Sequence, residues 1–386
     1  MKTIRILALH LAYGGVEKAV IGMANLFVER YPTEIISVYR LPNAPAYPLD
    51  ERVKLRYLLT ERPNREAWHA AVKARQPAAI LRESALAIKV LWKKKQAVRQ
   101  TIRSIHDGVL ITTRHEDNLV ASRLGDPAVW KIAQFHHDHR FLKKYIDGFR
   151  HGYGGLDVLT LLTPGLVEEV RQWLPADAKT RPVYVPNFLE HFPEPFSLAQ
   201  KEKRIVAVGR LDPVKGFDRL IRCFAGVHRG HPDWTLRIIG DGAEQERLRQ
   251  LIDELWLGAS VVLTGRLDEA GVEEEMKRAS VYAMTSHSEG FPFVLLEAQS
   301  CALPVVAYDV RVGPAAVITD GGDGFLVADG DEAAFSARLT ELMEDDALRL
   351  RMAQAAQEHV RAFSREKVAA IWETVLDPKA ETSETR

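Results

Sequence analysis

The sequence predicts an α/β protein made of two domains, each with a parallel β-sheet covered by helices. The chain of 386 residues is long enough for two domains of ordinary size. Short β-branched runs alternate with longer stretches of helical periodicity, which is typical of parallel sheets. A proline-rich passage at residues 175–195 divides this alternation into two similar series. Two such halves favour a ligand site in a cleft where strand carboxyl ends converge.

The first series precedes the proline-rich passage. Its expected strands are Ile4–Leu9, Ile35–Tyr39, Val109–Thr113, Val129–Gln134 and Leu156–Leu161. Its expected helices are Val16–Arg30, Ala85–Ser104 and Pro164–Trp173. We expect one short strand, Val183–Val185, inside the passage, which otherwise connects the domains.

The second series begins at Arg204. Its expected strands are Ile205–Val208, Thr235–Ile239, Val261–Thr264, Val281–Met284 and Pro304–Ala307. Its expected closing helices are Glu332–Asp345, Leu348–Phe363 and the amphipathic Arg365–Leu376. We therefore expect domains at residues 1–190 and 200–362, with a helix at about 363–376 that crosses back to the first domain.

Composition and charge exclude several classes of protein. A hydrophobic share of 46% and a charged share of 27% indicate a globular protein. Net charge is zero, but residues 52–103 hold fourteen Lys or Arg against three Asp or Glu, which indicates an anionic partner such as a phosphate-bearing acceptor or a membrane surface. Nucleic acid is not an expected partner. No apolar stretch reaches the roughly 20 residues that span a bilayer.

The N-terminus and the cysteines predict a cytoplasmic location. The first nine residues form one short apolar run, which indicates a strand and not a signal peptide. Cys223 and Cys301 lie in apolar helical contexts, as small core residues of a reducing compartment do.

The strongest local signal is the segment Val208–Gly216, which directly follows an expected strand and precedes a helix. Glycines let the backbone come close to a ligand, and the following helix presents N–H groups and the positive end of its dipole. Arg210 and Lys215 add two cations at this turn. The Gly-Lys-Ser/Thr order of a Walker A loop is missing. The segment fits diphosphate binding, and a strand–helix turn with surface cations is the alternative.

A second signal is the segment Ser286–Glu297, which follows a strand, turns and opens a helix. We expect Glu289 at the helix entrance and Glu297 about two turns further on, near one helix face, since eight residues slightly exceed two turns. N–H groups at Gly290–Phe293 can bind oxygen atoms of a sugar or phosphate. The two carboxylates can accept hydrogen bonds from vicinal hydroxyls. The alternative is an acidic helix start with Glu297 in solvent.

Together the two segments resemble the retaining GT-B glycosyltransferases of family 4, which carry an Arg…Lys-Gly loop and a Glu-x7-Glu helix. The resemblance covers most of the C-terminal half and includes Ile239–Gly242, Thr264–Arg266 and Ala298–Pro304. Ala302 stands where the family usually has glycine, and we expect no functional consequence. The resemblance implies two facing Rossmann-like domains with a cleft between them. The N-terminal domain would bind the acceptor and the C-terminal domain the nucleotide-sugar donor.

The resemblance also implies roles for individual residues. Arg210 and Lys215 would hold the donor diphosphate, Glu297 the ribose, and Glu289 the transferred sugar as a catalytic residue. The turn at Thr264–Arg266 would line the base pocket. The remaining donor-site residues that it implies are Gly242, Thr264, Gly265, Arg266, Gly290, Phe291, Pro292 and Phe293.

In the N-terminal half, Gly14 and Gly15 link the first strand to the first helix. Two adjacent glycines let the chain approach a ligand closely. In the family this loop touches the donor and shapes the acceptor site, and the resemblance carries that role to both glycines.

Residues 135–139, Phe-His-His-Asp-His, follow another expected strand. A metal site is one interpretation, but adjacent histidines on an extended segment do not easily share one metal, and no further ligand pattern stands out. We expect no metal and no other cofactor. The family places a functional histidine at this strand end, near the transferred sugar. His136 matches best, and His137 is the alternative, as is a histidine paired only with nearby backbone.

The segment 89–103 is basic and amphipathic, with Trp92 among apolar residues. Peripheral docking on the inner face of the plasma membrane is one interpretation, and a solvated helix face beside an anionic acceptor is the other.

We therefore predict a retaining glycosyltransferase that moves a hexose or N-acetylhexosamine from a nucleotide diphosphate sugar, with UDP favoured over GDP or ADP. The expected acceptor is a cell-envelope glycan, teichoic acid or lipid-linked sugar. Two rival hypotheses are a GT-B sugar-nucleotide epimerase or hydrolase, and a non-catalytic nucleotide-sugar-binding subunit.

Overall fold

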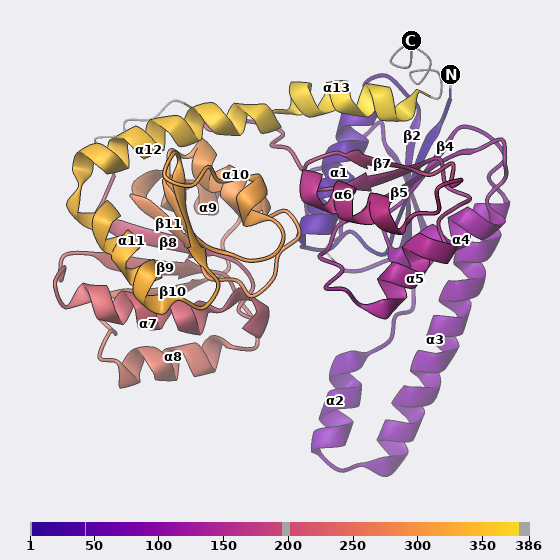
Figure 1. Cartoon of the computed structure of the whole chain (residues 1–386). Coiled ribbons are helices and arrows are strands. Elements are labelled where there is room, and N and C mark those ends of the chain that lie inside the picture. Colours follow the sequence, from indigo (N-terminus) through magenta and orange to yellow (C-terminus); the bar gives the residue numbers. More distant parts are fainter. Residues whose placement is uncertain (1, 43, 195–200, 378–386) are drawn as a thin grey trace, which may run out of the picture. The chain divides into compact units, whose positions relative to one another are not determined.

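The computed structural model describes residues 2–42, 44–194 and 201–377, which form two compact units, each with its own parallel sheet (Figure 1). The first unit comprises the chain up to Leu161, the segment Leu166–Val185 and the chain from Ala369 on. The second comprises Leu162–Gly165 and Pro186–Val368. The predicted α/β class with two parallel sheets is confirmed.

The first unit holds a seven-stranded sheet in the order β3-β2-β1-β4-β5-β6-β7, and all its neighbours are parallel. The strands are β1 Ile4–Ala8, β2 Thr33–Tyr39, β3 Lys54–Leu59, β4 Val109–Thr112, β5 Trp130–Phe135, β6 Val158–Leu161 and β7 Arg181–Tyr184. The helices are α1 Gly15–Phe27, α2 Arg65–Lys73, α3 Pro77–Arg103, α4 His115–Leu124, α5 Lys143–His151 and α6 Pro164–Trp173.

Both edge strands of this sheet differ from the sequence prediction. β3 is absent from the prediction because its residues are half-exposed or exposed and mix charged with apolar side chains. β7 extends the sheet, where we expected a short strand in a connection. Pro182 is tolerated there because an edge strand leaves one row of N–H groups unpaired. Helix α3 begins at Pro77, eight residues before the expected start, with proline in its first turn.

The second unit holds a six-stranded parallel sheet in the order β10-β9-β8-β11-β12-β13. The strands are β8 Arg204–Val208, β9 Thr235–Ile239, β10 Val261–Gly265, β11 Val281–Met284, β12 Val305–Asp309 and β13 Gly324–Ala328. The helices are α7 Phe217–His228, α8 Gln245–Glu254, α9 Glu269–Arg278, α10 Phe293–Ser300, α11 Glu332–Glu344 and α12 Asp346–His359. Short 3-10 turns occur at Pro213–Lys215, Pro314–Ala316 and Val360–Phe363.

Helices cover both faces of the second sheet, which explains its nearly continuous apolar strands. Ile205 and Ala207 of β8 belong to one buried cluster, whereas Val206 between them belongs to another. Successive side chains of a strand point to opposite faces, so the two clusters are the cores on either side. Cys223 and Cys301 are unpaired and buried, one in each core.

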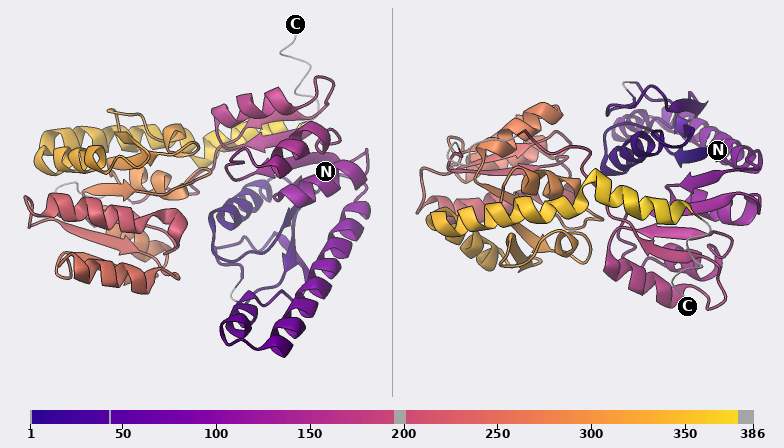
Figure 2. Two further views of the ribbon diagram at one scale, coloured as in Figure 1. Left: turned by 60° about the horizontal axis from the view of Figure 1, so that its bottom comes forward. Right: turned by 90° about the horizontal axis from the view of Figure 1, so that it is seen from above.

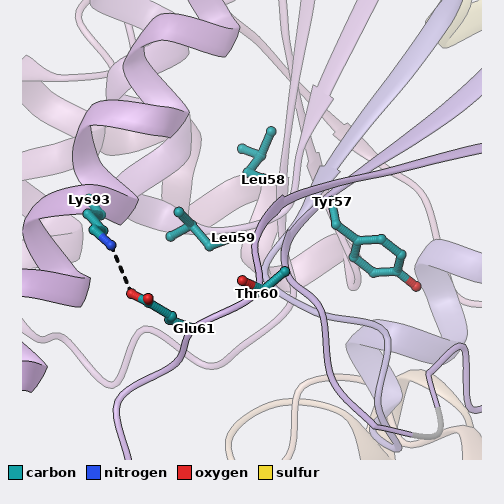
Figure 3. Close-up of a pocket in the computed structure, with 6 residues that line it drawn as sticks. All are labelled: Tyr57, Leu58, Leu59, Thr60, Glu61 and Lys93. Atoms are coloured by element: carbon teal, nitrogen blue, oxygen red, sulfur yellow. Dashed lines mark hydrogen bonds and ion pairs between the residues drawn. The ribbon is translucent and has the colours of Figure 1, made fainter.

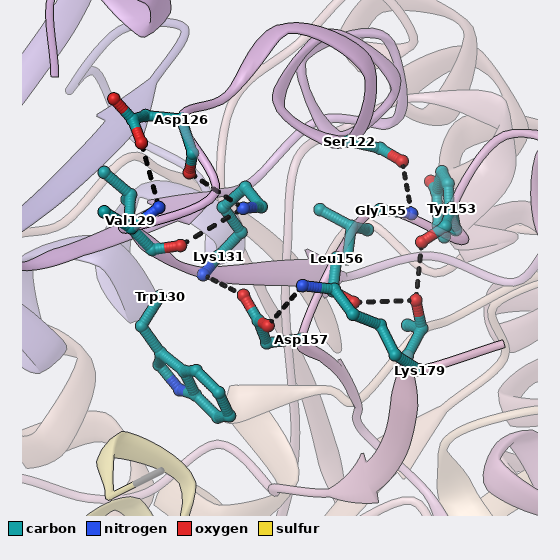
Figure 4. Close-up of polar contacts among 12 residues, drawn as sticks. Ser122, Asp126, Val129, Trp130, Lys131, Tyr153, Gly155, Leu156, Asp157 and Lys179 are labelled. Atoms are coloured by element: carbon teal, nitrogen blue, oxygen red, sulfur yellow. Dashed lines mark hydrogen bonds and ion pairs between the residues drawn. The ribbon is translucent and has the colours of Figure 1, made fainter. Parts of the chain in front are cut away.

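A polar network fixes the amino ends of β5, β6 and β7 (Figure 4). Asp157 accepts a hydrogen bond of 2.7 Å from the backbone N–H of Lys131 and pairs with Lys179 at 2.8 Å. Gly155 lies beside α4, where a Cβ atom would come within 2.1 Å of the Ser122 carbonyl oxygen. Gly152 and Gly155 thus meet a packing requirement at the edge opposite the strand carboxyl ends.

Helix α13, Arg365–Leu376, ends the described chain, and its residues from Ala369 on belong to the first unit. The Trp372 ring packs edge-on against Phe27 of α1, with ring centroids 5.1 Å apart. Trp130 donates a hydrogen bond of 3.0 Å to the Val375 carbonyl oxygen. The last helix is thereby part of the first unit's core.

We predict that Trp372→Ala destabilises the first unit by about 3–5 kcal/mol, the usual cost of deleting a buried aromatic side chain. Trp372 is only 2% exposed. Thermal and chemical unfolding followed by circular dichroism measures the change. The neighbouring Glu373→Ala is the matched control, because Glu373 pairs with Arg30 on the surface and such pairs contribute about 0–1 kcal/mol. Equal stability of the two variants would contradict the assigned packing.

Candidate functional site

The strand order of the second sheet reverses between β8 and β11, which are neighbours in the sheet although β9 and β10 lie between them in the chain. In open parallel sheets, ligands bind outside the strand carboxyl ends at such a reversal, because the loops after the two strands diverge there. The loop after β8 holds Arg210 and Lys215, and the loop after β11 holds Glu289. The topology therefore brings the two predicted segments together.

The contacts between these loops require a glycine. His287 donates a backbone hydrogen bond of 2.7 Å to the Val214 carbonyl oxygen. The Thr285 hydroxyl donates one of 2.8 Å to the Gly216 carbonyl oxygen. Gly216 has the left-handed φ of 60°, and a Cβ atom there would lie 2.2 Å from the Thr285 carbonyl oxygen. A side chain at this position would separate the two loops.

The closest contact between the two predicted segments is an ion pair. The Lys215 ammonium lies 2.7 Å from Oε1 of Glu289, and their side chains are 22% and 9% exposed. The Arg210 side chain is instead 74% exposed and pairs with Asp212 at 2.9 Å. Asp212 also accepts a hydrogen bond from the Val214 N–H and so shapes the turn. The two predicted cations thus occupy different environments, one half-buried against a carboxylate and one in solvent.

The structure corrects the expected placement of Glu289. Helix α10 begins at Phe293, with Pro292 as its N-cap, so Glu289 lies in the preceding loop and shares no helix face with Glu297. Glu297 is half-buried in the second turn of α10. The physical reason is Pro292, which fixes the chain in an extended conformation and delays the helix start.

Two residues that the sequence reasoning missed support this loop. Asn187 is buried and donates a hydrogen bond of 3.1 Å to the Phe291 carbonyl oxygen. Gly313 has a φ of 109°, and a Cβ atom there would lie 3.1 Å from Cβ of Glu289 and 3.3 Å from the carbonyl oxygen of Gly290. The Gly-Pro dipeptide at 313–314 is a turn signal that could have indicated this position.

The loops after β9 and β10 extend the site along the same edge. Leu211 donates a backbone hydrogen bond of 2.7 Å to the Asp241 carbonyl oxygen. A Cβ atom on Gly242 would lie 2.3 Å from the Leu211 carbonyl oxygen. Gly240 donates to the Gly265 carbonyl oxygen at 3.0 Å. Backbone contacts therefore join the predicted loops after β8, β9 and β10.

The side chains of the third loop differ in exposure. The Thr264 hydroxyl donates a hydrogen bond of 2.9 Å to the carbonyl oxygen of Gly265, which has a left-handed φ of 76°. Arg266 follows and is exposed.

Arg219 of α7 is a further residue that the sequence gave no reason to select. Its guanidinium donates to the carbonyl oxygens of Thr285 and Ser286, at 3.1 Å for Ser286. It also pairs with Asp329 at 2.7 Å and lies over the Tyr308 ring, 4.3 Å from its centroid. A guanidinium that holds two carbonyl oxygens fixes the start of the Glu289 loop. No local motif distinguishes it from other helix arginines.

In the first unit the corresponding reversal lies between β1 and β4. Helix α1 begins at Gly15, and Gly14 is its N-cap. A Cβ atom on Gly14 would lie 2.2 Å from Oε2 of Glu17. Glu17 is buried and lies 3.3 Å from Nδ1 of His10. Gly14 thus packs closely against Glu17 at the start of α1, on the edge where the strand carboxyl ends lie.

The predicted histidines follow β5, which is the neighbour of β4 in the first sheet. His136 is buried, with Nε2 3.2 Å from the Gln134 side-chain oxygen, and its Nδ1 has no hydrogen-bond partner within the described residues. Burial, with smaller contributions from His137 and Arg114, lowers the pKa of His136 to about 3. His137 is exposed. His139 is buried, and its Nε2 lies 2.6 Å from Glu169, which makes it a structural residue.

Arg114 follows β4 and was also missed by the sequence reasoning. Its charge acts to lower the pKa of both His10 and His136, so it lies near the loops after β1 and β5. Asp117, one turn further on, is 2% exposed, and burial raises its pKa to about 6. A cation directly after an expected strand is the signal that could have identified Arg114.

Asp331 caps helix α11 by accepting a hydrogen bond of 2.9 Å from the Ala334 N–H. Within residues 2–42, 44–194 and 201–377, no group of three or more His, Cys, Asp or Glu could hold a metal ion. No helix in the same ranges is both long and apolar enough to cross a membrane.

Comparisons with known proteins indicate which class of protein this chain resembles. Residues 190–359 match the family model described as glycosyl transferases group 1. The chain is 28% identical over 356 residues to the amylovoran biosynthesis glycosyltransferase AmsD of Erwinia amylovora, covering 89% of this chain and 90% of that protein. It is 33% identical over 386 residues to an exopolysaccharide phosphotransferase of Streptomyces coelicolor, covering 94% of this chain but only 39% of that longer protein.

The fold also matches solved structures. S. aureus TarM, crystallised as a variant with fondaparinux, α-GlcNAc-glycerol and UDP, superimposes with a TM-score of 0.76 at 14% identity, over 98% of this chain and all of that one. This likeness and the two parallel sheets confirm the predicted GT-B fold. Together with the sequence matches, they support a group 1 glycosyltransferase.

We predict that His136→Asn makes the free energy of unfolding less sensitive to acid. The pKa of His136 is about 3 in the folded chain, against an ordinary value of 6.5. Between these two pH values the His136 imidazole therefore binds a proton in the unfolded chain but stays neutral in the folded one. Stability is therefore lost as pH falls from 6.5 toward 3. Between pH 7 and pH 5 His136 accounts for about 2 kcal/mol of that loss.

Denaturant unfolding of each variant at pH 7 and at pH 5 gives the change in its free energy of unfolding between the two pH values. Any cost of the substitution that does not depend on pH cancels in this change. The exposed His151→Asn is the control and should keep the wild-type difference. If His136→Asn loses as much free energy of unfolding between pH 7 and pH 5 as the wild type does, the lowered pKa of His136 is contradicted.

Proposed function

We propose that this chain is a retaining glycosyltransferase that moves a hexose or N-acetylhexosamine from a nucleotide diphosphate sugar, with UDP the favoured nucleotide. The observation that carries the proposal is the ion pair of Lys215 and Glu289, 2.7 Å apart at the strand reversal of the second sheet. A cation that can bind phosphate and a carboxylate that can bind sugar hydroxyls are thereby held at one point, as transfer from a sugar diphosphate requires.

The donor would lie on the second unit. Lys215 and Arg210 would bind the diphosphate, and the exposure of Arg210 leaves it able to swing toward a phosphate. Glu297 would accept hydrogen bonds from the ribose hydroxyls and Glu289 from the transferred sugar. The turn at Thr264–Arg266 would contact the base. Cations near the leaving diphosphate stabilise the charge that develops as the glycosidic bond breaks, which is usually the largest catalytic contribution.

We propose front-face attack as the reaction step. The bond between the anomeric carbon and the diphosphate oxygen breaks, the acceptor oxygen bonds to the same face, and the acceptor's proton passes to the departing phosphate oxygen. No metal ion or other cofactor enters this step. The lowered pKa of His136 keeps its imidazole neutral at physiological pH, so it would contribute a hydrogen bond to the sugar and not a positive charge.

The acceptor and location are proposed from the relatives' names. AmsD is a glycosyltransferase of amylovoran biosynthesis, and TarM was crystallised with α-GlcNAc-glycerol and UDP. We propose a cell-envelope glycan, teichoic acid or lipid-linked sugar as acceptor, which places the enzyme in the cytoplasm at the inner face of the plasma membrane. Gly14 and Gly15 would contact the donor and help to shape the acceptor site of the first unit.

We predict that Arg210→Ala and Glu297→Ala each weaken binding of the preferred UDP-sugar by about 10- to 100-fold. Each removes charge-assisted hydrogen bonds of about 1.5–3 kcal/mol. Calorimetric titration and thermal shift with UDP-, GDP-, ADP- and TDP-sugars measure the affinity and name the base. Arg222→Ala is the matched control, since Arg222 is an exposed arginine of α7 outside the site. Equal weakening in all three variants would contradict the proposed site.

We also predict an α-configured product from an α-configured donor, read from the anomeric signal of the product by nuclear magnetic resonance. Inversion at the anomeric carbon, or a trapped glycosyl-enzyme intermediate, would contradict front-face retention. Consumption of the donor without an acceptor would favour the epimerase or hydrolase hypothesis. Donor binding without transfer to any of a broad panel of acceptors would favour a non-catalytic subunit.

A further inference from the structure

A helical hairpin, α2 and α3, connects β3 to β4 and extends away from the first unit's sheet (Figures 1 and 2). The buried residues of α3, Val90, Val98, Thr101 and Ile102, lie from the middle of the helix to its C-terminal end. Before Val90, residues of α3 that include Ser84, Ala87 and Ile88 line a groove together with Trp68 of α2. The hairpin therefore presents surface that the unit's own core does not need.

One face of α3 exposes a row of large apolar side chains. Leu81, Ile88 and Trp92 are 73%, 69% and 62% exposed, and the exposed Ala85 lies between them. These four positions are four, three and four residues apart, which places them on one side of a helix. We call them the outer stripe. Isolated apolar residues are common on surfaces, but a continuous row of this kind marks a contact with another body.

The apolar surface continues from the outer stripe into a groove between the two helices. The groove has a volume of about 330 Å³, and its lining includes Trp68, Ile88 and Leu91. Trp68 is held there by a hydrogen bond of 3.1 Å from its indole N–H to the Ser84 hydroxyl. Ile88 belongs to both the stripe and the groove, so the two form one apolar face.

Cations surround this apolar face. Residues 52–103 carry fourteen Lys or Arg against three Asp or Glu, an excess of eleven. Arg82 and Lys89, both exposed, lie about a quarter turn from the stripe, and Lys95 continues it toward the C-terminus of α3. An apolar face bordered by long basic side chains is the pattern of helices that lie in a lipid interface, where tryptophan is also favoured.

The hairpin is held against the sheet at its base. Lys93 of α3 pairs at 2.9 Å with Glu61, which follows β3 (Figure 3). The two residues lie at a pocket of about 190 Å³ lined also by Tyr57–Thr60. Together with buried Val98 and Ile102, this contact gives the outer stripe a fixed orientation relative to the first unit.

We propose that the α2–α3 hairpin docks the protein on an anionic lipid bilayer, with the outer stripe among the acyl chains and the flanking lysines at the headgroups. Charge complementarity selects this occupant: a second copy of the chain would bring two strongly basic surfaces together, whereas anionic headgroups neutralise them. The proposal concerns a hairpin of the first unit, whereas the donor site is proposed on the second unit, and it does not depend on which sugar is transferred.

The test is co-sedimentation of the full chain with vesicles of phosphatidylcholine alone or with about 30% phosphatidylglycerol, a content at which polybasic surfaces bind well. We expect binding to the anionic vesicles, weakened at least tenfold in Ile88→Ser/Trp92→Ser and in Lys89→Gln/Lys95→Gln, and also by high salt. All four side chains are half-exposed or more, so the variants should fold, which circular dichroism checks.

The matched control is Trp256→Ser, which removes the 93% exposed tryptophan of the second unit and should leave vesicle binding unchanged. Equal loss in this control, or equal binding by wild type and the stripe variant, would overturn the proposal. Absence of vesicle binding together with self-association that Ile88→Ser/Trp92→Ser abolishes would overturn it in favour of a second copy. Loss of donor binding in Arg210→Ala with vesicle binding intact would separate the two proposed sites.

Discussion

The ligand edge of the second sheet depends on how closely the loops after β8 and β11 approach one another. Their backbones meet at Gly216, where the Thr285 carbonyl oxygen occupies the place of a Cβ atom. The reversal of strand order makes these loops neighbours, but only glycine lets them touch. Arg219 then fixes the start of the loop after β11 by donating hydrogen bonds to the carbonyl oxygens of Thr285 and Ser286. The position of Glu289 follows from these constraints, because it lies four residues past the point of contact.

The same approach determines the electrostatics of the site. A half-buried lysine loses hydration, and pairing with a carboxylate offsets that cost. Lys215 and Glu289 therefore stabilise one another until a ligand supplies a stronger partner. A diphosphate with two negative charges could replace Glu289 as the partner of Lys215, which would free the carboxylate for hydroxyl groups. In the proposed site, phosphate binding to Lys215 would thereby be coupled to the availability of Glu289.

The sequence predicted what depends on local pattern. The interior strands of both sheets were predicted to within two residues at each end, whereas the edge strand β13 was not predicted. The two loop segments were selected because charge and glycine stand beside a strand end. Arg219 and Gly313 were missed because the residues they contact are distant in the chain: Thr285 is 66 positions from Arg219, and Glu289, Gly290 and Pro292 are 21 to 24 positions from Gly313. The edge strand β3 was missed because its exposure removes the apolar pattern. Ala302, the residue after the C-cap of α10, has a left-handed φ of 53°, a conformation that glycine adopts more readily than alanine.

The first unit carries a local excess of positive charge in residues 52–103, although the chain as a whole is neutral. The whole chain balances 52 basic against 52 acidic residues, so outside residues 52–103 there remain 38 basic and 49 acidic, a deficit of eleven that equals the excess within them. A neutral molecule is not drawn to a charged surface from a distance, and salt screens such fields within about 8 Å. Only a projecting element can bring its charge that close. The length of α3 beyond the sheet is therefore what would bring this local excess of charge close to an anionic surface.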